Sequence, residues 1–339
     1  TSQMTFKELT KKVADGGRLS ADESQDAFNA ILSGEPSPLL TAAFLTSLHQ
    51  RGETSDEVLG AVRALRIRMT IFPGAEDAVD VCGTGGDQHG TVNVSTAVAF
   101  VLAGAGVKVA KHGNRAVSSR SGSSDILSEL GIKIDVAANK MRKALDTANV
   151  CFLHAPIYHA AMKNVSAIRA ELGFRTIFNL IGPLTNPARV RRQVIGVFDK
   201  SWCDPMARIL QTLGSEHVWV VHGGDGMDEI TTTTSTYVVE QARESMRSFD
   251  ITPKQEGVKT ATLEQLKGGD AKTNAGHFKK LLHREKGPYR DIVCLNAAAG
   301  LIIAGKAKHL KDGIALAAEA IDSGKAAEAL EKLIQITNE

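Results

Sequence analysis

Residues 79–131 decide the fold of this chain, and they read VDVCGTGGDQHGTVNVSTAVAFVLAGAGVKVAKHGNRAVSSRSGSSDILSELG. Two short apolar runs, residues 79–82 and 107–110, each end in a loop rich in glycine and polar residues. Each loop leads into a segment whose residue pattern is typical of a helix. This order predicts two strand–loop–helix units in succession. The first loop, which begins at Gly83, and the second loop, which begins at Lys111, therefore follow the carboxyl ends of two strands.

Both loops carry groups that can bind phosphate. Glycines let backbone N–H groups approach an anion closely, and a helix that begins near Asn93 offers N–H groups and a partial positive charge. Lys111 and Arg115 add cations. Ligands of open α/β sheets bind beyond the carboxyl ends of the strands, so the two loops predict a cradle for more than one phosphate. The alternative is that the glycines only make tight turns and that both cations are solvated.

Neither loop matches a common nucleotide-binding fingerprint. A dinucleotide-binding turn would need a third glycine at position 88, where the chain has Gln88. The nearest match to a P-loop, residues 300–306, is followed by Ala307 where Ser or Thr would bind the metal. Its surroundings, LNAAAGLIIAGKAKHL, are typical of a packed helix.

Three motifs in this stretch resemble the signature loops of the anthranilate phosphoribosyltransferase family. They are GTGGD at residues 83–87, GTVNVST at 90–96 and KHGNRAVSS at 111–119. The similarity covers essentially the whole chain. It implies transfer of the 5-phosphoribosyl group from phosphoribosyl pyrophosphate to the amino group of anthranilate, with release of pyrophosphate, in tryptophan biosynthesis. It also implies Mg²⁺ as the cofactor and a homodimer joined through a helical domain.

The resemblance assigns the site residues as well. The phosphoribosyl donor would be held by Gly83, Gly86, Asp87, Thr91, Asn93, Val94, Ser95, Thr96, Lys111, His112, Gly113, Asn114, Arg115, Ala116, Val117, Ser118, Ser119 and Ser123. Anthranilate would be held or approached by Gly83, His112, Asn114, His159, Arg169 and Pro183. The metal ligands would be Ser95, Asp228 and Glu229. No general acid or base is assigned, because an aromatic amine is already neutral near neutral pH.

An acidic loop also favours a metal. Residues 217–221 form an apolar run that ends in HGGDGMDEITTTT, so Asp225, Asp228 and Glu229 follow the carboxyl end of a further strand. Mg²⁺ typically takes one or two carboxylates, keeps several waters and shares phosphate oxygens of the substrate. Taken alone, such carboxylates are more often solvated turn residues.

His159 and Arg169 follow a strand predicted at residues 150–153. Taken alone, His159 is more often a satisfied or solvated histidine, and Arg169 would ordinarily be a surface residue of a helix. The resemblance assigns both to anthranilate. We therefore expect the planar guanidinium of Arg169 to pair with the carboxylate of anthranilate.

The chain predicts two domains of different class. Residues 1–72 predict helices only, with capping boxes at residues 20–23 and 54–57. Pro73 and Gly74 then mark the change to alternating strands and helices, which continues with strands at 193–198 and 217–221 and a helix at 204–213. We expect a small N-terminal helical domain at 1–72, joined by a later helical segment near 164–186. A larger α/β domain at 73–339 would have a mainly parallel central sheet flanked by helices.

Composition excludes some functions. Lys and Arg number 40 against 38 Asp and Glu, so the net charge of +2 gives no general attraction to nucleic acid or membrane. The four cysteines lack metal-binding spacing, which indicates buried free thiols in a reducing compartment. The polar start lacks a secretory signal, and the longest apolar run, 97–107, is too short to span a bilayer. We expect a cytoplasmic protein that binds neither nucleic acid nor membranes.

Two other functions remain open. A pyrimidine nucleoside phosphorylase has a similar architecture and also reacts at the anomeric carbon of a ribose. Its phosphate substrate needs no magnesium, so the pair Asp228 and Glu229 argues against it. A noncatalytic nucleic-acid-binding relative of the same fold is the second alternative, and the balanced charge disfavours it.

Overall fold

The computed structural model describes residues 3–85, 93–114 and 123–339. The chain forms two compact units. The helical unit comprises Thr1–Ile71 and Ala155–Pro187, and the α/β unit comprises Phe72–His154 and Ala188–Glu339. The domain boundaries 1–72 and 73–339 stay a prediction.

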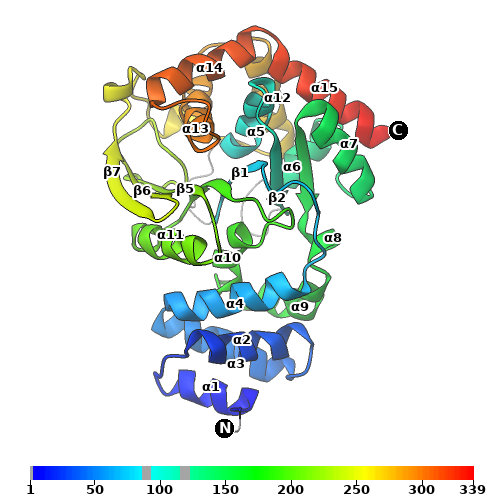
Figure 1. Cartoon of the computed structure of the whole chain (residues 1–339), viewed down its shortest axis with the longest axis vertical. Coiled ribbons are helices and arrows are strands. Elements are labelled where there is room, and N and C mark those ends of the chain that lie inside the picture. The colour runs from blue at the N-terminus through cyan, green and yellow to red at the C-terminus, as the bar shows by residue number, and fades with distance from the viewer. Residues whose placement is uncertain (1–2, 86–92, 115–122) are drawn as a thin grey trace. The chain divides into compact units, whose positions relative to one another are not determined.

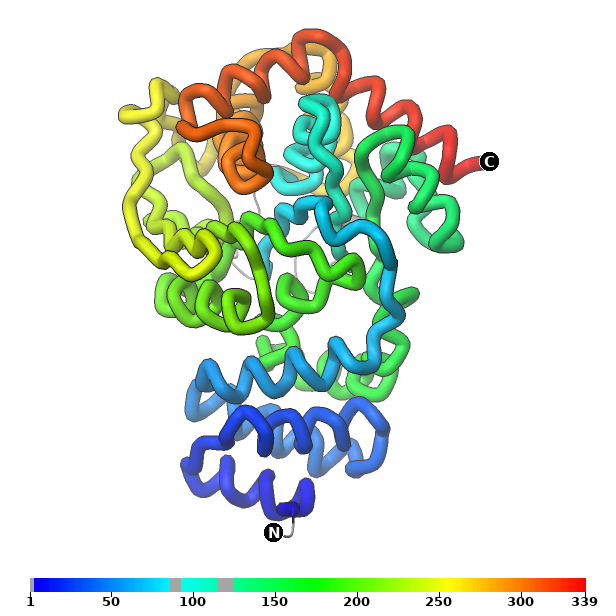
Figure 2. The backbone as a smooth tube through the Cα atoms, in the orientation of Figure 1, coloured from blue at the N-terminus to red at the C-terminus, as the bar shows by residue number. Residues whose placement is uncertain are grey.

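The helical unit is built from two separate stretches of chain. Its elements are α1 (Phe6–Ala14), α2 (Ala21–Leu32), α3 (Pro38–Arg51), α4 (Ser55–Arg68), α8 (Ala155–Tyr158), η1 (Ala160–Met162), α9 (Lys163–Leu172), α10 (Phe178–Ile181) and η2 (Gly182–Leu184). Both predicted capping boxes are confirmed, at the starts of α2 and α4. Figure 2 shows α9 beside α2 and α3, and Phe178 of the second stretch packs edge-on against Phe28 of the first.

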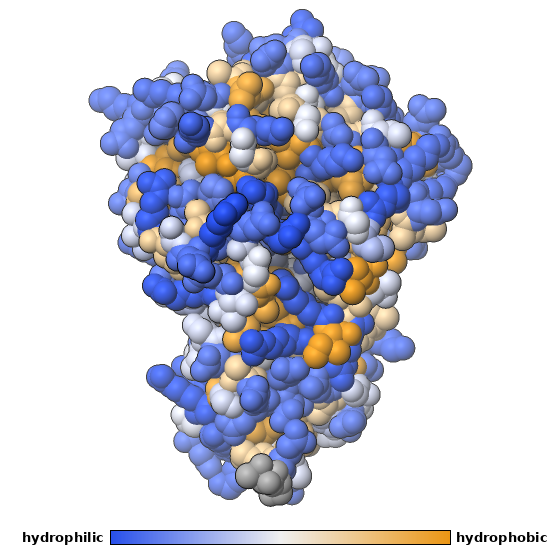
Figure 3. Space-filling model, viewed as in Figure 1, coloured by the Kyte–Doolittle hydropathy of each residue, from blue (hydrophilic) through white to orange (hydrophobic). Residues whose placement is uncertain are grey.

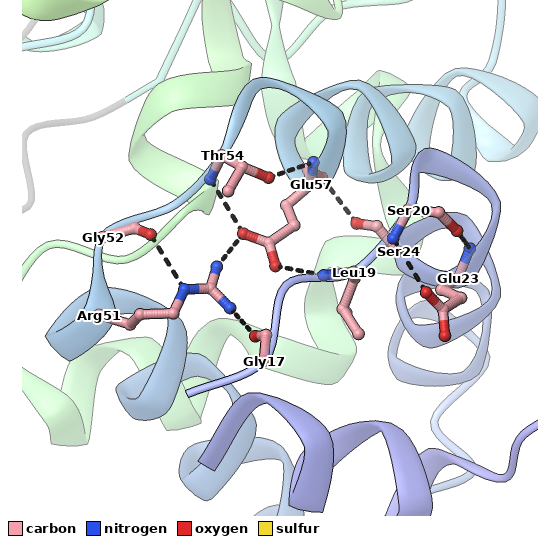
Figure 4. A network of polar contacts seen from close by, with 9 residues as sticks. All are labelled: Gly17, Leu19, Ser20, Glu23, Ser24, Arg51, Gly52, Thr54 and Glu57. Carbon is pink, nitrogen blue, oxygen red and sulfur yellow. Dashed lines mark hydrogen bonds and ion pairs between the residues drawn. The ribbon is translucent and has the colours of Figure 1, made fainter. Parts of the chain in front are cut away.

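The buried carboxylate of Glu57 ties the helical unit together (Figure 4). It accepts hydrogen bonds from the backbone N–H of Leu19 at 3.0 Å and of Thr54 at 2.9 Å, and it pairs with Arg51. Arg51 also donates to the carbonyl oxygen of Gly17. A buried charge is tolerated when it is paired and hydrogen bonded. This network therefore holds in place the segments that precede α2 and α4.

The α/β unit contains one sheet of seven strands in the order β3-β2-β1-β4-β5-β6-β7. The strands are β1 (Val79–Gly83), β2 (Val109–Gly113), β3 (Val150–His154), β4 (Arg192–Gly196), β5 (His217–Gly223), β6 (Thr236–Ala242) and β7 (Ser245–Ile251). The first five in spatial order run parallel, while β6 pairs antiparallel with β5 and β7 pairs antiparallel with β6. The predicted mainly parallel sheet is confirmed.

Helices cover both faces of this sheet. They are α5 (Val94–Gly104), α6 (Ser123–Glu129), α7 (Ala138–Ala148), α11 (Cys203–Thr212), α12 (Ala271–Leu282), α13 (Pro288–Ile303), α14 (Leu310–Asp322) and α15 (Lys325–Asn338). The chain moves from β1 outward to β3 in one direction and from β4 to β5 in the other. Because such crossovers are right-handed, α5 and α11 lie on opposite faces, with α13 on the side of α5 (Figure 1).

Two strand predictions were wrong at their ends. The strand predicted at residues 107–110 is displaced, because β2 covers Val109–Gly113 and includes Lys111, His112 and Gly113. These three residues pair in register with β3. The ladder is formed by backbone groups, so a polar side chain does not end a strand. The sequence of residues 231–240 likewise suggests extended structure, but the strand there begins only at Thr236.

The predicted burial of the cysteines as free thiols is confirmed, and the reducing compartment stays a prediction. Cys82, Cys151, Cys203 and Cys294 are all buried and free of disulfide bonds. Burial raises the pKa of each thiol. Within the ranges that the structure describes, no helix has both the length and the apolar character needed to cross a membrane.

Candidate functional site

The reversal of strand order lies between β1 and β4. Gly83, the last residue of β1, pairs with Gly196, the last residue of β4. The backbone N–H of Thr84 donates to the carbonyl oxygen of Gly196 at 2.9 Å, and its hydroxyl accepts from the N–H of Phe198 at 3.1 Å. Ligands of open α/β sheets bind in the crevice beyond such a reversal, so the fold indicates a site at these strand ends.

The acidic loop, residues 224–230 after β5, reaches the same strand ends. The N–H of Gly85 donates to Oδ2 of Asp228 at 2.8 Å. A Cβ atom at Gly83 would lie 2.4 Å from that carboxylate, and one at Gly196 would lie 1.5 Å from the carbonyl oxygen of Asp228. Only glycine permits this approach, so two glycines hold the acidic loop against the first loop.

Asp225 fixes the shape of the acidic loop. Its carboxylate accepts hydrogen bonds from the hydroxyl of Thr231 at 2.7 Å, the hydroxyl of Thr233 at 2.5 Å and the N–H of Met227 at 3.0 Å. These three bonds engage Asp225 with the acidic loop and with the two threonines that follow it. Asp228 and Glu229 are therefore the carboxylates that the loop presents at the strand ends.

Lys111 lies inside the unit. Its side chain is 3% exposed, and Nζ donates to the carbonyl oxygen of Val81 on β1 at 2.9 Å. The alternative of a solvated Lys111 is wrong. Val81 lies two residues before the end of β1. The buried ammonium of Lys111 therefore adds positive charge close to the first loop.

Tyr289 and Asn274 hold Asn93, the residue that immediately precedes α5. The hydroxyl of Tyr289 donates to the carbonyl oxygen of Asn93 at 3.0 Å. The amide of Asn274 donates to Oδ1 of Asn93, also at 3.0 Å. Burial, and next the nearby carboxylate of Glu229, raise the pKa of Tyr289. Tyr289 is therefore bonded to Asn93 and feels the charge of Glu229.

The α/β unit thus contains most of the described site residues, at the carboxyl ends of β1, β2 and β5. They are Gly83, Asn93, Val94, Ser95, Thr96, Lys111, His112, Gly113, Asn114, Asp228 and Glu229. Outside the described residues lie Gly86, Asp87, Thr91, Arg115, Ala116, Val117, Ser118 and Ser119. Ser123 begins α6, and its side chain is not described.

The helical unit contains His159, Arg169 and Pro183. His159 is 4% exposed, and its Nε2 donates to the carbonyl oxygen of Thr185 at 2.9 Å. Burial lowers the pKa of His159 to about 4, so its imidazole is neutral at neutral pH. Arg169 of α9 is half-buried, and its guanidinium carbon lies 5.7 Å from the ring centre of Phe178. Burial lowers its pKa from the usual range.

Acid should destabilise the protein through His159. Below the unfolded value near 6.5 the unfolded chain gains a proton that the folded imidazole does not accept until about pH 4. Stability present above pH 6.5 is therefore lost as the pH falls, by up to about 3 kcal/mol from this group. Urea unfolding of the full chain between pH 7 and pH 4.5 measures the loss.

His159→Gln, whose amide can still donate to Thr185, should reduce that loss, whereas replacement of the exposed His309 by Gln should leave it unchanged. An equal pH dependence in all three proteins would contradict the assignment.

The acidic loop suits Mg²⁺ rather than a metal held by many side chains. Over residues 3–85, 93–114 and 123–339, no group of three or more His, Cys, Asp or Glu side chains could hold a metal ion. Mg²⁺ needs only one or two carboxylates, because waters and substrate phosphates complete its coordination. The hard oxygen donors of Asp228, which accepts from the N–H of Gly85, and of its neighbour Glu229 fit that requirement.

Sequence reasoning missed three residues of this site: Gly196, Asn274 and Tyr289. A glycine at the end of an apolar run is a signal of close backbone approach, and Gly196 carries it. Asn274 and Tyr289 lie between residues 241 and 290, for which the sequence pattern predicts no definite element.

Comparison with known proteins covers both units. Residues 7–69 match the helical bundle domain of a glycosyl transferase family, and residues 75–327 match its α/β domain. An anthranilate phosphoribosyltransferase from Rhodopseudomonas palustris (strain HaA2) is 52% identical over 332 residues, which cover 98% of each chain.

Solved structures agree. The anthranilate phosphoribosyltransferase from Thermus thermophilus is similar with a TM-score of 0.91 and 41% identity, over 98% of this chain and 99% of that one. The enzyme from Saccharomyces cerevisiae, in complex with phosphoribosyl pyrophosphate and Mg, is similar with a TM-score of 0.90 and 29% identity, over 99% of both chains.

Proposed function

Because the chain belongs to the anthranilate phosphoribosyltransferase family, we propose that it transfers the 5-phosphoribosyl group from phosphoribosyl pyrophosphate to the amino group of anthranilate. Pyrophosphate is released and N-(5-phosphoribosyl)anthranilate is formed, in tryptophan biosynthesis. The observation that supports this most is the approach of the acidic loop to the first loop, which leads into α5, at the strand-order reversal. A dense anion with a metal needs such a meeting of amides and carboxylates.

The amide-rich side of the site would hold the phosphoribosyl donor. Backbone N–H groups at the start of α5 and the positive end of its dipole favour the negative charge that develops on the leaving pyrophosphate. Lys111, buried beside β1, adds to that field. The donor-binding residues that fall outside the described ranges, such as Asp87 and Arg115, belong to the same proposal.

The acidic loop would hold Mg²⁺ through Asp228 and Glu229, with Ser95 from α5. When bound, the ion neutralises charge on the departing pyrophosphate. The N–H of Gly85 holds one carboxylate oxygen of Asp228 and so orients the group. The yeast relative that was solved with phosphoribosyl pyrophosphate and Mg supports magnesium as the metal.

Anthranilate would be held by Arg169 and Asn114 and approached past Gly83, His112, His159 and Pro183. The amine needs no strong base, so catalysis rests on alignment with the ribose carbon and on leaving-group charge. His159 donates to Thr185 and is neutral, so it would contribute as a fixed wall rather than as a proton carrier.

Loss of anthranilate fluorescence tests the function. The purified protein should consume anthranilate only when both phosphoribosyl pyrophosphate and Mg²⁺ are present. Phosphorolysis of thymidine or uridine in place of this reaction would favour the nucleoside phosphorylase alternative. If the protein shows neither activity, the noncatalytic alternative is favoured.

Arg169→Ala should raise KM for anthranilate by roughly ten- to a hundredfold, because a charge-assisted bidentate pair is lost. KM for the donor should change little. Arg169→Lys keeps the charge but not the planar fork, so its KM should lie between those of the other two proteins. Replacement of the exposed Arg18 by Ala is the control. A donor KM that rises while the anthranilate KM stays constant would remove the assignment.

We further propose a homodimer joined through the helical unit, in the cytoplasm. Six large hydrophobic side chains are exposed among the described residues, and four belong to this unit: Leu39, Ile67, Ile71 and Phe174. In Figure 3, hydrophobic atoms are exposed among hydrophilic ones over α4. Exposed apolar side chains on this unit support a protein contact there. Leu39→Glu, at a side chain that is 82% exposed, should yield monomers in sedimentation.

A further inference from the structure

Helix α13 passes through the interior of the α/β unit. Residues 292–303 are all buried, and the helix contacts β1, β4, β5 and α5. Two of its polar side chains, Tyr289 and Asn296, are seven positions apart. Seven residues make nearly two turns, so both side chains lie on one face of the helix. Each bonds to a different part of the candidate site.

Tyr289 holds the start of α5. Its hydroxyl is a donor here, because the carbonyl oxygen of Asn93 can only accept, and the two oxygens are 3.0 Å apart. Asn274 of α12 holds the side chain of the same residue, and Asn274 is itself fixed by the N–H of Gly269 at 2.9 Å. Asn93 immediately precedes α5. Its backbone and side chain are therefore both held, which sets the direction of the first N–H groups of that helix.

Asn296 holds the acidic loop. Its Oδ1 accepts from the N–H of Ile230 at 3.0 Å, and its Nδ2 donates to the carbonyl oxygen of Ile230 at 2.9 Å. A third bond, from Nδ2 to the carbonyl oxygen of Ile292 at 2.9 Å, anchors the amide to α13. Ile230 directly follows Glu229 and is fully buried, while Asn296 is 3% exposed. The backbone beside the acidic pair thus has its position set from inside the unit.

We propose that α13 sets the spacing between the two halves of the donor site, and that Tyr289 and Asn296 are positioning residues of the reaction. Neither side chain is assigned to a substrate. Helix α13 is one rigid element, so the amide-rich half and the acidic half are held against the same reference. This inference rests on the proposed function, since the spacing matters only if both halves bind one metal-bound diphosphate.

Tyr289→Phe keeps the ring and removes only the hydroxyl. Calorimetric titration with phosphoribosyl pyrophosphate in excess Mg²⁺ should give a Kd roughly tenfold higher than for the unchanged chain. KM for anthranilate should not change, and Tm should fall by only a few degrees. Tyr237→Phe on β6 removes a hydroxyl elsewhere in the same unit and should leave Kd unchanged. Donor affinity unchanged by Tyr289→Phe, with or without a loss of Tm, would overturn the inference for this half.

Asn296→Asp keeps the size and one acceptor but loses the donor to Ile230. The Mg²⁺ concentration that gives half-maximal binding of the donor should rise at least about tenfold. Thr337→Val, which removes a buried hydroxyl of α15, is the matched control. A Mg²⁺ dependence equal to that of the control would overturn the inference for the acidic half. If Asn296→Asp does not fold, the donor Kd is measured for Asn274→Asp, which loses the donor to Asn93. The inference is then decided by Asn274→Asp together with Tyr289→Phe.

The unchanged chain separates the two levels of the proposal. If it neither binds the donor with Mg²⁺ nor consumes anthranilate, the proposed function fails. If it does both while Tyr289→Phe and Asn296→Asp behave like their controls, only the role of α13 fails.

Discussion

Asp228→Asn combined with Glu229→Gln should lower kcat/KM for phosphoribosyl pyrophosphate by about a thousandfold or more. Metal neutralisation of a leaving phosphate contributes several kcal/mol, and three factors of ten correspond to about 4 kcal/mol. Both changes keep side-chain size, and an amide oxygen at position 228 can still accept from the N–H of Gly85. The fold should therefore survive. Initial rates across a Mg²⁺ titration, with Tm recorded alongside, measure the effect.

The control for this double change is Asp250→Asn with Glu244→Gln, two exposed carboxylates in and next to β7. It should leave the titration unchanged. If the double change at 228 and 229 gave the same Mg²⁺ dependence as this control, the acidic loop would not be the metal site.

A single methyl group at Gly196 should also remove most activity. Its Cβ would lie 1.5 Å from the carbonyl oxygen of Asp228, close to a covalent distance, so the acidic loop or β4 must move. Overpacking of this kind costs about 1–3 kcal/mol of stability. Because the moved loop carries both proposed metal ligands, we expect kcat/KM to fall by more than about a hundredfold, as a misplacement of 1 Å can produce.

Gly276→Ala in α12 is the matched control, since a Cβ there meets nothing within 4 Å. In a helix that change should stabilise the protein by about 0.5–1 kcal/mol. Gly196→Ala with normal activity would show that the close approach has no role in function.

Local patterns were sufficient to predict several of the elements and the fold class. The capping boxes of α2 and α4 depend on residues three apart, and the sequence displays both partners. The strand–loop–helix order around β1 and α5 likewise depends on neighbours along the chain. The alternation of strands and helices along the chain then predicts a mainly parallel sheet.

Contacts between distant segments could not be read in the same way. The pairing of Gly83 with Gly196 joins residues more than a hundred positions apart. The sequence around either glycine does not identify the other as its partner. Lys111 was assigned to a loop because it is charged, although its backbone pairs with Phe152 and its ammonium reaches Val81.

Asn296 illustrates what the pattern can and cannot give. It is a polar residue within the apolar run LNAAAG, which signals a buried amide that must find partners. The sequence does not identify Ile230 as the partner, because that choice depends on where the acidic loop folds back. The roles of the other candidate residues stay predictions for the experiments above.

The interleaving of the two units along the chain has a consequence for biosynthesis. A nascent polypeptide that has left the ribosome up to residue 154 contains β1, β2 and β3, but its first four helices still lack α9 and α10. The β1 edge that β4 later covers, including Val81, stays open until about forty more residues emerge. An uncovered apolar edge favours aggregation. During synthesis there is therefore an interval in which neither unit can complete its fold. In that interval the exposed β1 edge is a binding site for chaperones.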